Sequence, residues 1–273
     1  QGPGNVPGQA ENVDFQTCPV TSRDDGSWTC SYIPKDWTNE IRLVLRKEGY
    51  ATTFPTVPVA KVDLNSLVLV LNRGFTVTGR VVDTRDQAVA DAHIKILTSE
   101  TGKRQSVDTD ENGIFTLTGV AGDSAFSREP RLETNDSGTV FIRGLIGEGS
   151  LHVNLAVQAD GFAPRTDTVE LSKATNAAEF VLSPGHVFRG RVVDESGKPI
   201  SNAVVQTDWD NQGLRAFDWK TRTDAAGRFE WDSAPGGPTL FWFEAAGYRW
   251  NRGVSLSADG SDHRVVLNRP TTP

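Results

Sequence analysis

The chain has 273 residues, a formal net charge of −7 with both signs mixed along it, and 37% hydrophobic residues. This length allows two or three domains, and the modest hydrophobic share suits several small β domains better than one large core. The charge argues against a basic face for nucleic acid, and no apolar run approaches the roughly 18 residues of a membrane span. The sequence contains no Met, so we expect a processed or excised chain from which any signal peptide has been removed.

A polar turn with a central glycine recurs between runs of apolar residues. The copies, with the Gly-aromatic pair that follows each, are residues 22–28 with Gly49-Tyr50, 134–138 with Gly161-Phe162, and 223–229 with Gly247-Tyr248. Asp or Asn starts such a hairpin turn, and glycine accepts the positive φ that the turn needs. The three copies predict an all-β chain of three tandem sandwich-like repeats, 1–73, 74–184 and 185–273, arranged as a rod.

The first repeat lacks an opening strand. Residues 12–17 align with 202–207 of the third repeat, where strand 190–194 precedes them, and strand 79–83 opens the second repeat in the same way. Either the missing strand lies upstream in a longer precursor, or another chain supplies it, or the chain was cut at this point. An open sheet edge is a template for strand addition, so the second alternative makes the chain a subunit of an assembly.

Two cysteines flank the first hairpin turn. Cys18 and Cys30 stand at equal distances from position 24, so they are opposed across the hairpin with side chains on one face. Two free buried thiols are the alternative, but this placement favours a disulfide. A disulfide indicates an oxidising compartment outside the cytoplasm, so we expect an extracellular or cell-surface protein.

The junctions between repeats are short and equal in length. Leu71 precedes Gly79 by eight positions, and Leu182 precedes Gly190 by eight. Junctions of this kind predict fixed orientations between neighbouring repeats rather than a flexible string. Within the first repeat, residues 41–48 alternate between apolar and polar side chains, which is typical of a sheet with one face in water.

The second repeat carries an insertion. Thr134 precedes Phe162 by 28 positions, as Ser22 precedes Tyr50, so the turn at 134 has the spacing expected of the repeat. Another turn of the same composition, at 109–115, lies too far from Phe162. We therefore interpret residues 108–133 as an extra hairpin or long loop at one end of the second sandwich.

Segments 77–83 and 189–203, the turns of the form Thr-Asp-x-x-Gly-x-Phe and the Gly-aromatic pairs resemble carboxypeptidase-regulatory-like domains. The resemblance covers most of 74–268 and, more loosely, the first repeat. It implies a transthyretin-like (prealbumin-like) sandwich of seven strands, of the broad immunoglobulin-like kind, and non-catalytic modules of secreted or surface proteins. The sandwich is similar to pilin-like modules with Lys–Asn isopeptide bonds, but the opening strands 79–83 and 190–194 contain no Lys, so no such bond is predicted.

Five of the seven tryptophans lie between residues 209 and 250. Trp219 and Trp231 stand as far from their turn as the cysteines do from theirs, which predicts a cross-strand aromatic pair with a structural role. Counting back from Gly247-Tyr248 places Phe241 and Phe243 in the core. The residues that alternate with these two phenylalanines therefore point outward.

Leu240, Trp242 and Glu244 form this outward stripe, which needs a cover. The loop 208–218 is the favoured cover, and the alternatives are a neighbouring repeat, another subunit, or a sugar ring stacked on Trp. The candidate ligand-binding or interface residues are Trp209, Arg215, Leu240, Trp242, Glu244 and Trp250.

Metal binding and catalysis have little support in the sequence. Asp108, Asp110 and Asn112 match the start of a calcium-binding loop, but the closing bidentate Glu is absent and a solvated turn is favoured. The four histidines are scattered without metal spacing, and the sequence has no Gly-x-Ser-x-Gly elbow or Gly-rich phosphate loop. We expect no enzyme activity and no cofactor.

These observations predict a non-catalytic extracellular protein with a structural or adhesive role. Its specific form is a filament or surface-layer subunit that uses strand addition at an open edge, with protein partners through self-association or a longer parent chain. The alternative is a carbohydrate-binding accessory region of a larger secreted enzyme, with a polysaccharide as partner. Nucleic acid and membrane insertion are not expected.

Overall fold

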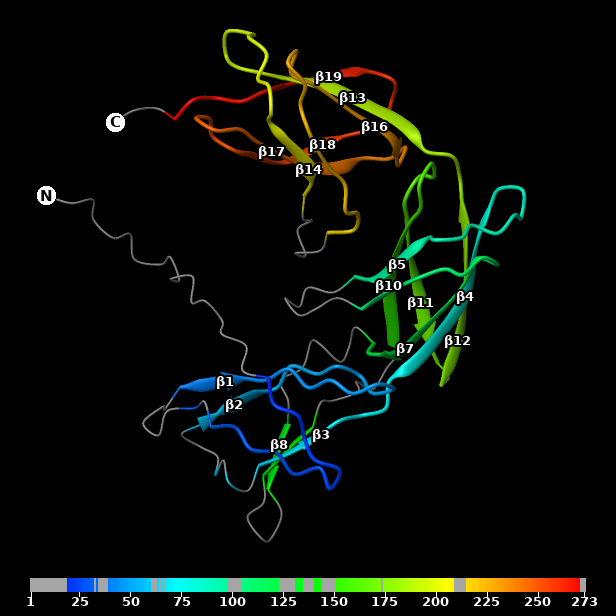
Figure 1. The fold of residues 1–273 in the computed structure, drawn as a ribbon, viewed down its shortest axis with the longest axis vertical. Coiled ribbons are helices and arrows are strands. Elements are labelled where there is room, and N and C mark those ends of the chain that lie inside the picture. Colours follow the sequence, from blue (N-terminus) through cyan, green and yellow to red (C-terminus); the bar gives the residue numbers. More distant parts are fainter. Residues whose placement is uncertain are drawn as a thin grey trace, which may run out of the picture.

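The computed structural model describes residues 19–31, 33, 39–59, 63, 65, 67–97, 105–122, 131–134, 140–143, 151–172, 174–208 and 215–270. Strands make up its regular structure, which confirms the predicted all-β class. Three lobes follow one another in a curved row, with the first repeat at the bottom of Figure 1 and the third at the top. Among the described residues, no helix is long and apolar enough to cross a membrane.

The third repeat is a complete sandwich of seven strands. Its strands are β13 (His186–Val193), β14 (Val204–Thr207), β15 (Lys220–Arg222), β16 (Arg228–Ala234), β17 (Thr239–Glu244), β18 (Asn251–Leu256) and β19 (Asp262–Val266). One sheet has the order β16-β13-β19 and the other β15-β14-β17-β18. The opening strand β13 runs parallel to the closing strand β19 and antiparallel to β16.

The second repeat has the same topology. Its strands are β4 (Phe75–Asp83), β5 (His93–Ile96), β6 (Ser106–Asp108), β7 (Ile114–Val120), β10 (Leu151–Gln158), β11 (Arg165–Leu171) and β12 (Thr175–Leu182). The sheets are β12-β4-β7 and β11-β10-β5-β6, and β4 runs parallel to β12. The two sandwiches therefore match strand for strand, apart from β8 and β9, which lie between β7 and β10 in the chain.

The Gly-aromatic pairs form the same turn in all three repeats. The aromatic backbone N–H donates to the carbonyl three residues earlier, from Tyr50 to Lys47 (3.0 Å), Phe162 to Ala159 (3.2 Å) and Tyr248 to Ala245 (3.1 Å). Each of the three glycines has a positive φ between 74° and 82°, which favours glycine. The same turn therefore occurs once in each of the three predicted repeats.

The hairpin turn of the second repeat lies at 109–115, not at 134–138 as predicted. Gly113 N donates to Asp110 O (2.9 Å) and Asp110 N to Ile114 O (2.9 Å), the same two bonds that Gly227 and Asp224 make in the third repeat. The prediction failed because an insertion lengthens this repeat, so the spacing from Thr134 to Phe162 matches the first repeat by coincidence.

The inserted segment is accordingly 121–150 rather than 108–133. In the third repeat, residues 235–238 alone connect β16 to β17, whereas residues 121–150 connect β7 to β10. This segment contains β8 (Arg131–Thr134) and β9 (Val140–Arg143), which pair antiparallel as a hairpin. The hairpin belongs to neither sheet of the second repeat.

The hairpin instead completes the first repeat, whose own strands are β1 (Glu40–Arg42), β2 (Thr56–Pro58) and β3 (Leu67–Val70). β9 runs parallel to β3, from Leu67 opposite Val140 to Val70 opposite Arg143, and β8 pairs with the other edge of β9 in the lower lobe of Figure 1. The order β3-β9-β8 reproduces β12-β4-β7 and β19-β13-β16. The opening strand that we expected upstream or from another chain thus comes from the second repeat.

The second and third repeats each enclose a large apolar core. Phe180 and Leu155 are at most 1% exposed in one, and Phe241 and Phe243 are equally buried in the other, as predicted. In the described part of the first repeat, a small cluster surrounds Val57 and Leu67, and Trp28 packs against it. Because burial of apolar surface is the main stabilising term, this described part depends more than the other repeats on its strand pairing.

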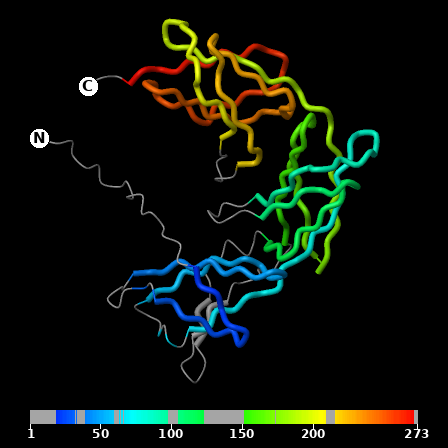
Figure 2. Tube along the Cα trace, in the orientation of Figure 1, coloured from blue at the N-terminus to red at the C-terminus, as the bar shows by residue number. Residues whose placement is uncertain are grey.

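The two junctions are built alike. Gly74 N donates to Gly49 O (3.1 Å), and Gly185 N donates to Gly161 O (3.0 Å). A Cβ at Gly74 would lie 2.3 Å from the backbone of Gly119, and one at Gly185 would lie 2.2 Å from the backbone of Ser233. Only glycine permits this approach. Figure 2 shows the coloured chain passing from each lobe to the next through one such segment.

Candidate functional site

The outer face of β17 and β18 carries the aromatic residues that the sequence singled out. Trp242 is half-buried and meets the ring of Trp250 edge-on, with 5.7 Å between the ring centroids. The Arg252 guanidinium lies 4.8 Å from the centre of the Trp242 ring, within cation–π distance. We call Trp242, Trp250 and Arg252 the aromatic face of the third repeat. Trp250 is 62% exposed, so this face reaches solvent.

A buried carboxylate holds Arg252 in place. Asp208 has 2% of its side chain exposed and accepts hydrogen bonds from Arg252 Nη2 (2.7 Å) and Nε (3.2 Å), and from Gly253 N (2.9 Å). The hydrogen bonds to Asp208 raise the pKa of the Arg252 guanidinium further above its usual range. Sequence reasoning did not find this pair, because β14 and β18 are not adjacent in the sheet and 44 residues separate the partners.

Of the other candidate residues, Leu240 is half-buried and Glu244 is exposed, in agreement with their predicted outward position. Trp209 lies outside the described residues. Among the described residues, the contacts over Trp242 come from Arg252 and Trp250. Residues 209–214 of the loop that we expected as its cover lie outside the described part, so that cover stays a prediction. The Trp242 Nε1 atom is buried and has no hydrogen-bond partner within the described part of the chain.

The end of that loop instead contacts the second repeat. The ammonium of Lys95 on β5 lies 2.5 Å from Asp218 Oδ2, and Asp218 N donates to Gln158 Oε1 on β10 (2.8 Å). Arg215 Nε lies 3.5 Å from Asp218 Oδ1. Lys95 is 3% exposed, and a charged group this buried needs a partner. The lone Lys between Ile94 and Ile96 was the sequence signal of this contact.

The predicted aromatic pair is confirmed. The rings of Trp219 and Trp231 stack with 4.9 Å between centroids and 11° between planes. Trp231 is 4% exposed and belongs to the core, which extends through Phe188 and Phe241. The pair is structural and does not line the aromatic face.

The remaining sequence candidates form local structure. Asp110 Oδ1 accepts from Asn112 N and Ile114 N, and Asp108 Oδ1 lies 2.6 Å from His93 Nδ1. The described residues contain no group of three or more side chains able to hold a metal ion. Cys30 carries a free thiol, while Cys18 lies outside the described residues, so their disulfide stays a prediction.

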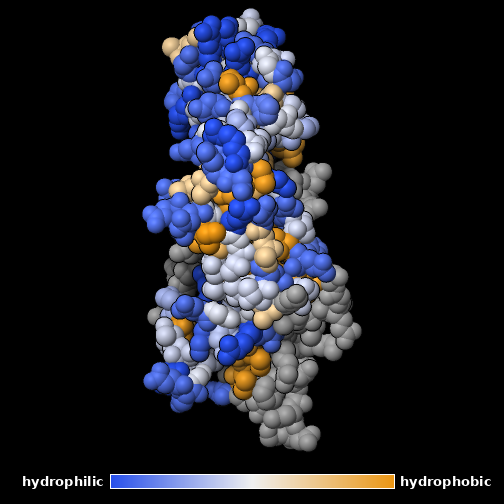
Figure 3. Space-filling model, turned by 90° about the vertical axis from the view of Figure 1, so that its right-hand side faces the viewer, coloured by the Kyte–Doolittle hydropathy of each residue, from blue (hydrophilic) through white to orange (hydrophobic). Residues whose placement is uncertain are grey.

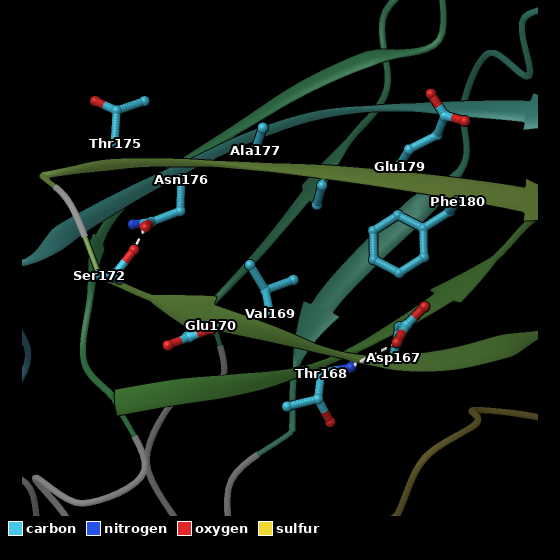
Figure 4. A pocket seen from close by; sticks show the side chains of 11 residues that line it. Asp167, Thr168, Val169, Glu170, Ser172, Thr175, Asn176, Ala177, Glu179 and Phe180 are labelled. Carbon is cyan, nitrogen blue, oxygen red and sulfur yellow. Dashed lines mark hydrogen bonds between the residues drawn. The ribbon is translucent and has the colours of Figure 1, made fainter. Parts of the chain in front are cut away.

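A groove runs between the edge strands β11 and β12 of the second repeat (Figure 4). Within the part of the chain that the structure describes, β11 pairs only with β10 and β12 only with β4, so each presents one unpaired backbone edge there. Val169 and Phe180 line the groove from its buried side, while the exposed side chains of Glu170 and Glu179 lie along it. Charged residues on edge strands are a common protection against indiscriminate strand pairing.

On the face shown in Figure 3, hydrophobic side chains form small separate spots on a mainly hydrophilic surface. The fold defines an array of β-sandwich modules. The family model of the carboxypeptidase regulatory-like domain matches residues 76–126 and 187–268. This match covers just under half of the chain, and it lies in the first part of the second repeat and in most of the third. No curated protein sequence matches the chain.

Solved structures give weaker likenesses. A streptococcal ancillary pilin is 12% identical with a TM-score of 0.33, and the alignment covers 85% of this chain and 76% of the pilin. The shaft pilin SpaA from Lactobacillus rhamnosus GG is 10% identical with a TM-score of 0.27, over 73% of this chain and 99% of the pilin. The 3-chlorocatechol 1,2-dioxygenase from Rhodococcus opacus 1CP is 15% identical with a TM-score of 0.27, over 45% and 66%. Likenesses at these scores carry no functional conclusion, because one fold serves many functions.

Proposed function

We propose that this chain is a non-catalytic extracellular structural protein in which three β-sandwiches act together as a stiff, curved spacer. The observation that carries the proposal is the hairpin β8–β9, which leaves the second repeat and pairs with β3 of the first. The two repeats thereby share strands in addition to the junction at Gly74. A module that served only as an independent binding unit would not need this connection.

The third repeat is also fastened to the second at two places. One is the junction bond from Gly185 N to Gly161 O, and the other is the contact of Asp218 with Lys95 and Gln158. Two separated attachments resist bending and twisting better than the short junction alone does. This arrangement supports a role in which the distance between the two ends of the chain matters.

Small-angle X-ray scattering of the full chain tests this proposal. A stiff spacer gives one elongated particle whose maximum dimension does not change with ionic strength. A distribution of dimensions that widens in salt, with independent motion of the three lobes, would contradict it.

Assembly into a filament or surface layer by strand addition is the finer form of the proposal. Because the hairpin pairs with β3, the edges that can accept a strand from a second copy include those of β11 and β12. Size-exclusion chromatography with light scattering at several concentrations tests this form. Large assemblies that a proline substitution at the exposed Thr168 on β11 abolishes would support it, since Pro removes a backbone donor. If the chain is a monomer at all concentrations, the proposed assembly is contradicted and the proposed role as a stiff spacer is unaffected.

A second candidate function, carbohydrate binding, is favoured by one specific feature. Trp250 exposes its ring beside Arg252 and Trp242, and an aromatic ring beside charged hydrogen-bonding groups suits a sugar ring. We expect Trp250→Ala to abolish retention on an insoluble polysaccharide without unfolding the repeat. Trp28→Ala, in the first repeat, is the control that should leave retention intact.

A further inference from the structure

Three arginines stand side by side on the outer face of the sheet β16-β13-β19 in the third repeat. Arg191 on β13 is directly opposite Arg228 on β16 and directly opposite Arg264 on β19. Neighbouring strands lie about 4.8 Å apart, so three positive charges fall within about 10 Å. We call Arg191, Arg228 and Arg264 the arginine row.

This row has no counter-charge among the described residues. None of the three guanidiniums lies within salt-bridge distance of a carboxylate there, although Arg228 and Arg264 are exposed. Arg191 is half-buried, and its Nε is fully buried without a hydrogen-bond partner. Like charges directly opposite each other destabilise a sheet, and a buried donor left unpaired adds a further cost.

The second repeat shows how the same position is satisfied elsewhere in this chain. Arg80 on β4 corresponds to Arg191, and its guanidinium contacts Glu179 (2.7 Å) on β12 and Asp86 (2.9 Å) in the following turn. The third repeat places Arg264 where Glu179 stands, and Gly197 where Asp86 stands. Both acids that neutralise Arg80 are thus absent, and one of them is replaced by a further positive charge.

The turn that contains Gly197 does not cover the arginine row. Gly197 has no side chain to lie over the row, and a Cβ there would make only ordinary contact with Arg264 Nη2, at 3.6 Å. In the next row on the same face, Arg189 lies between Glu230 and Asp262. Two acids therefore flank the positive charge of that row. The excess of positive charge is therefore confined to a single row.

We propose that the arginine row is a binding site for a ligand that carries phosphate or sulfate groups. Guanidinium groups bind oxyanions through paired, charge-assisted N–H···O bonds, and a tetrahedral group offers enough oxygens to bridge neighbouring arginines. A bound phosphate or sulfate oxygen would also accept a hydrogen bond from Arg191 Nε, which has no partner among the described residues. The arginine row lies on the sheet opposite to the one that bears the aromatic face. The proposed binding site does not depend on whether the chain acts as a spacer.

Isothermal titration calorimetry of the full chain with sodium tripolyphosphate and with dextran sulfate tests the site. Saturable binding that Arg264→Glu weakens at least about tenfold is the expected result, because this change removes one charge-assisted contact and creates an ion pair with Arg191. The double variant Gly197→Asp/Arg264→Glu copies the second repeat and should abolish binding while remaining folded. Arg228→Gln provides a further variant at an exposed edge position if the charge reversal unfolds the repeat.

Arg189→Gln is the matched control, because it removes the same charge from the same strand and face. Its dissociation constant should stay within about twofold of the wild type. Preference for one of the two probes distinguishes a phosphorylated ligand from a sulfated glycan. Equal binding of polyglutamate, unchanged affinity in Arg264→Glu, or no binding of either probe would overturn the proposal.

Discussion

At the scale of single residues, the buried carboxylate of Asp208 determines how the aromatic face is held. It orients Arg252, and Arg252 in turn lies over Trp242. The aromatic face therefore depends on an acid that lies underneath it.

We predict that Asp208→Asn lowers the free energy of unfolding of the third repeat by about 2 kcal/mol, since Arg252 is only partly buried and water replaces part of the lost contact. Urea unfolding followed by Trp fluorescence measures this change. Asp262→Asn, at an exposed position on β19, is the control and should change stability by less than about 0.5 kcal/mol. An equally small effect of Asp208→Asn would show that the pair does not hold the face.

The second prediction at this scale concerns pH. Hydrogen bonds from Ser196 Oγ (2.6 Å) and Lys198 N (2.9 Å) to its carboxylate hold the pKa of Asp194 below its ordinary value. A carboxyl group with a lowered folded-state pKa contributes stability above its unfolded pKa, near 4, and loses it as the pH falls through the folded value. The urea midpoint of the third repeat should therefore fall as the pH drops from about 5 to below 4.

Asp194→Asn should flatten this dependence without changing its direction, because other carboxyl groups also titrate. Asp83 occupies the same position in the second repeat, where Gln87 N and Arg85 lower its pKa in the same way. A pH dependence that is identical in wild type and Asp194→Asn would contradict this role of the turn.

At the scale of elements, the hairpin β8–β9 links the stability of the first repeat to the second. We predict that replacing residues 121–150 with Pro-Gly-Gly-Pro, the sequence that connects β16 to β17, unfolds the first repeat and leaves the second folded. The reason is that β3 loses its parallel partner in a repeat whose described residues bury little apolar surface. Limited proteolysis with mass spectrometry measures which repeats survive.

A matched variant keeps the hairpin but breaks its pairing. Pro at Ile142, opposite Leu69 in the parallel register, removes a backbone donor in β9. It should expose the first repeat to proteolysis in the same way. Protection of the first repeat in both variants would show that its own strands suffice.

At the scale of the whole molecule, the contact between Asp218 and Lys95 should limit motion between the second and third repeats. We predict that Asp218→Ala broadens the distribution of dimensions in small-angle scattering and costs the second repeat about 1–3 kcal/mol, because Lys95 loses a charged partner at a buried position. Asp232→Ala, at an exposed position of the third repeat, is the control and should change neither the scattering curve nor the stability of the second repeat. An unchanged scattering curve in Asp218→Ala would assign the fixed orientation to the Gly185 junction alone.

The sequence by itself determined the local features of this protein. Alternation of apolar residues predicted the strands, Gly247-Tyr248 and its counterparts predicted the recurring turn, and counting from that turn placed Phe241 and Phe243 in the core. Side-chain facing follows from a period of two along a strand, so nearby residues are sufficient to predict it.

Only the tertiary structure decided which segments pair. The hairpin at 131–143 pairs with residues 67–70, Lys95 meets Asp218 across 123 positions, and Arg191 meets Arg264 rather than an acid. Sheet edges accept any strand of suitable pattern, so spacing along the chain does not identify the partner. For this reason the sequence predicted the class of fold and the outward position of Trp242, while the origin of the missing strand and the arginine row came from the structure.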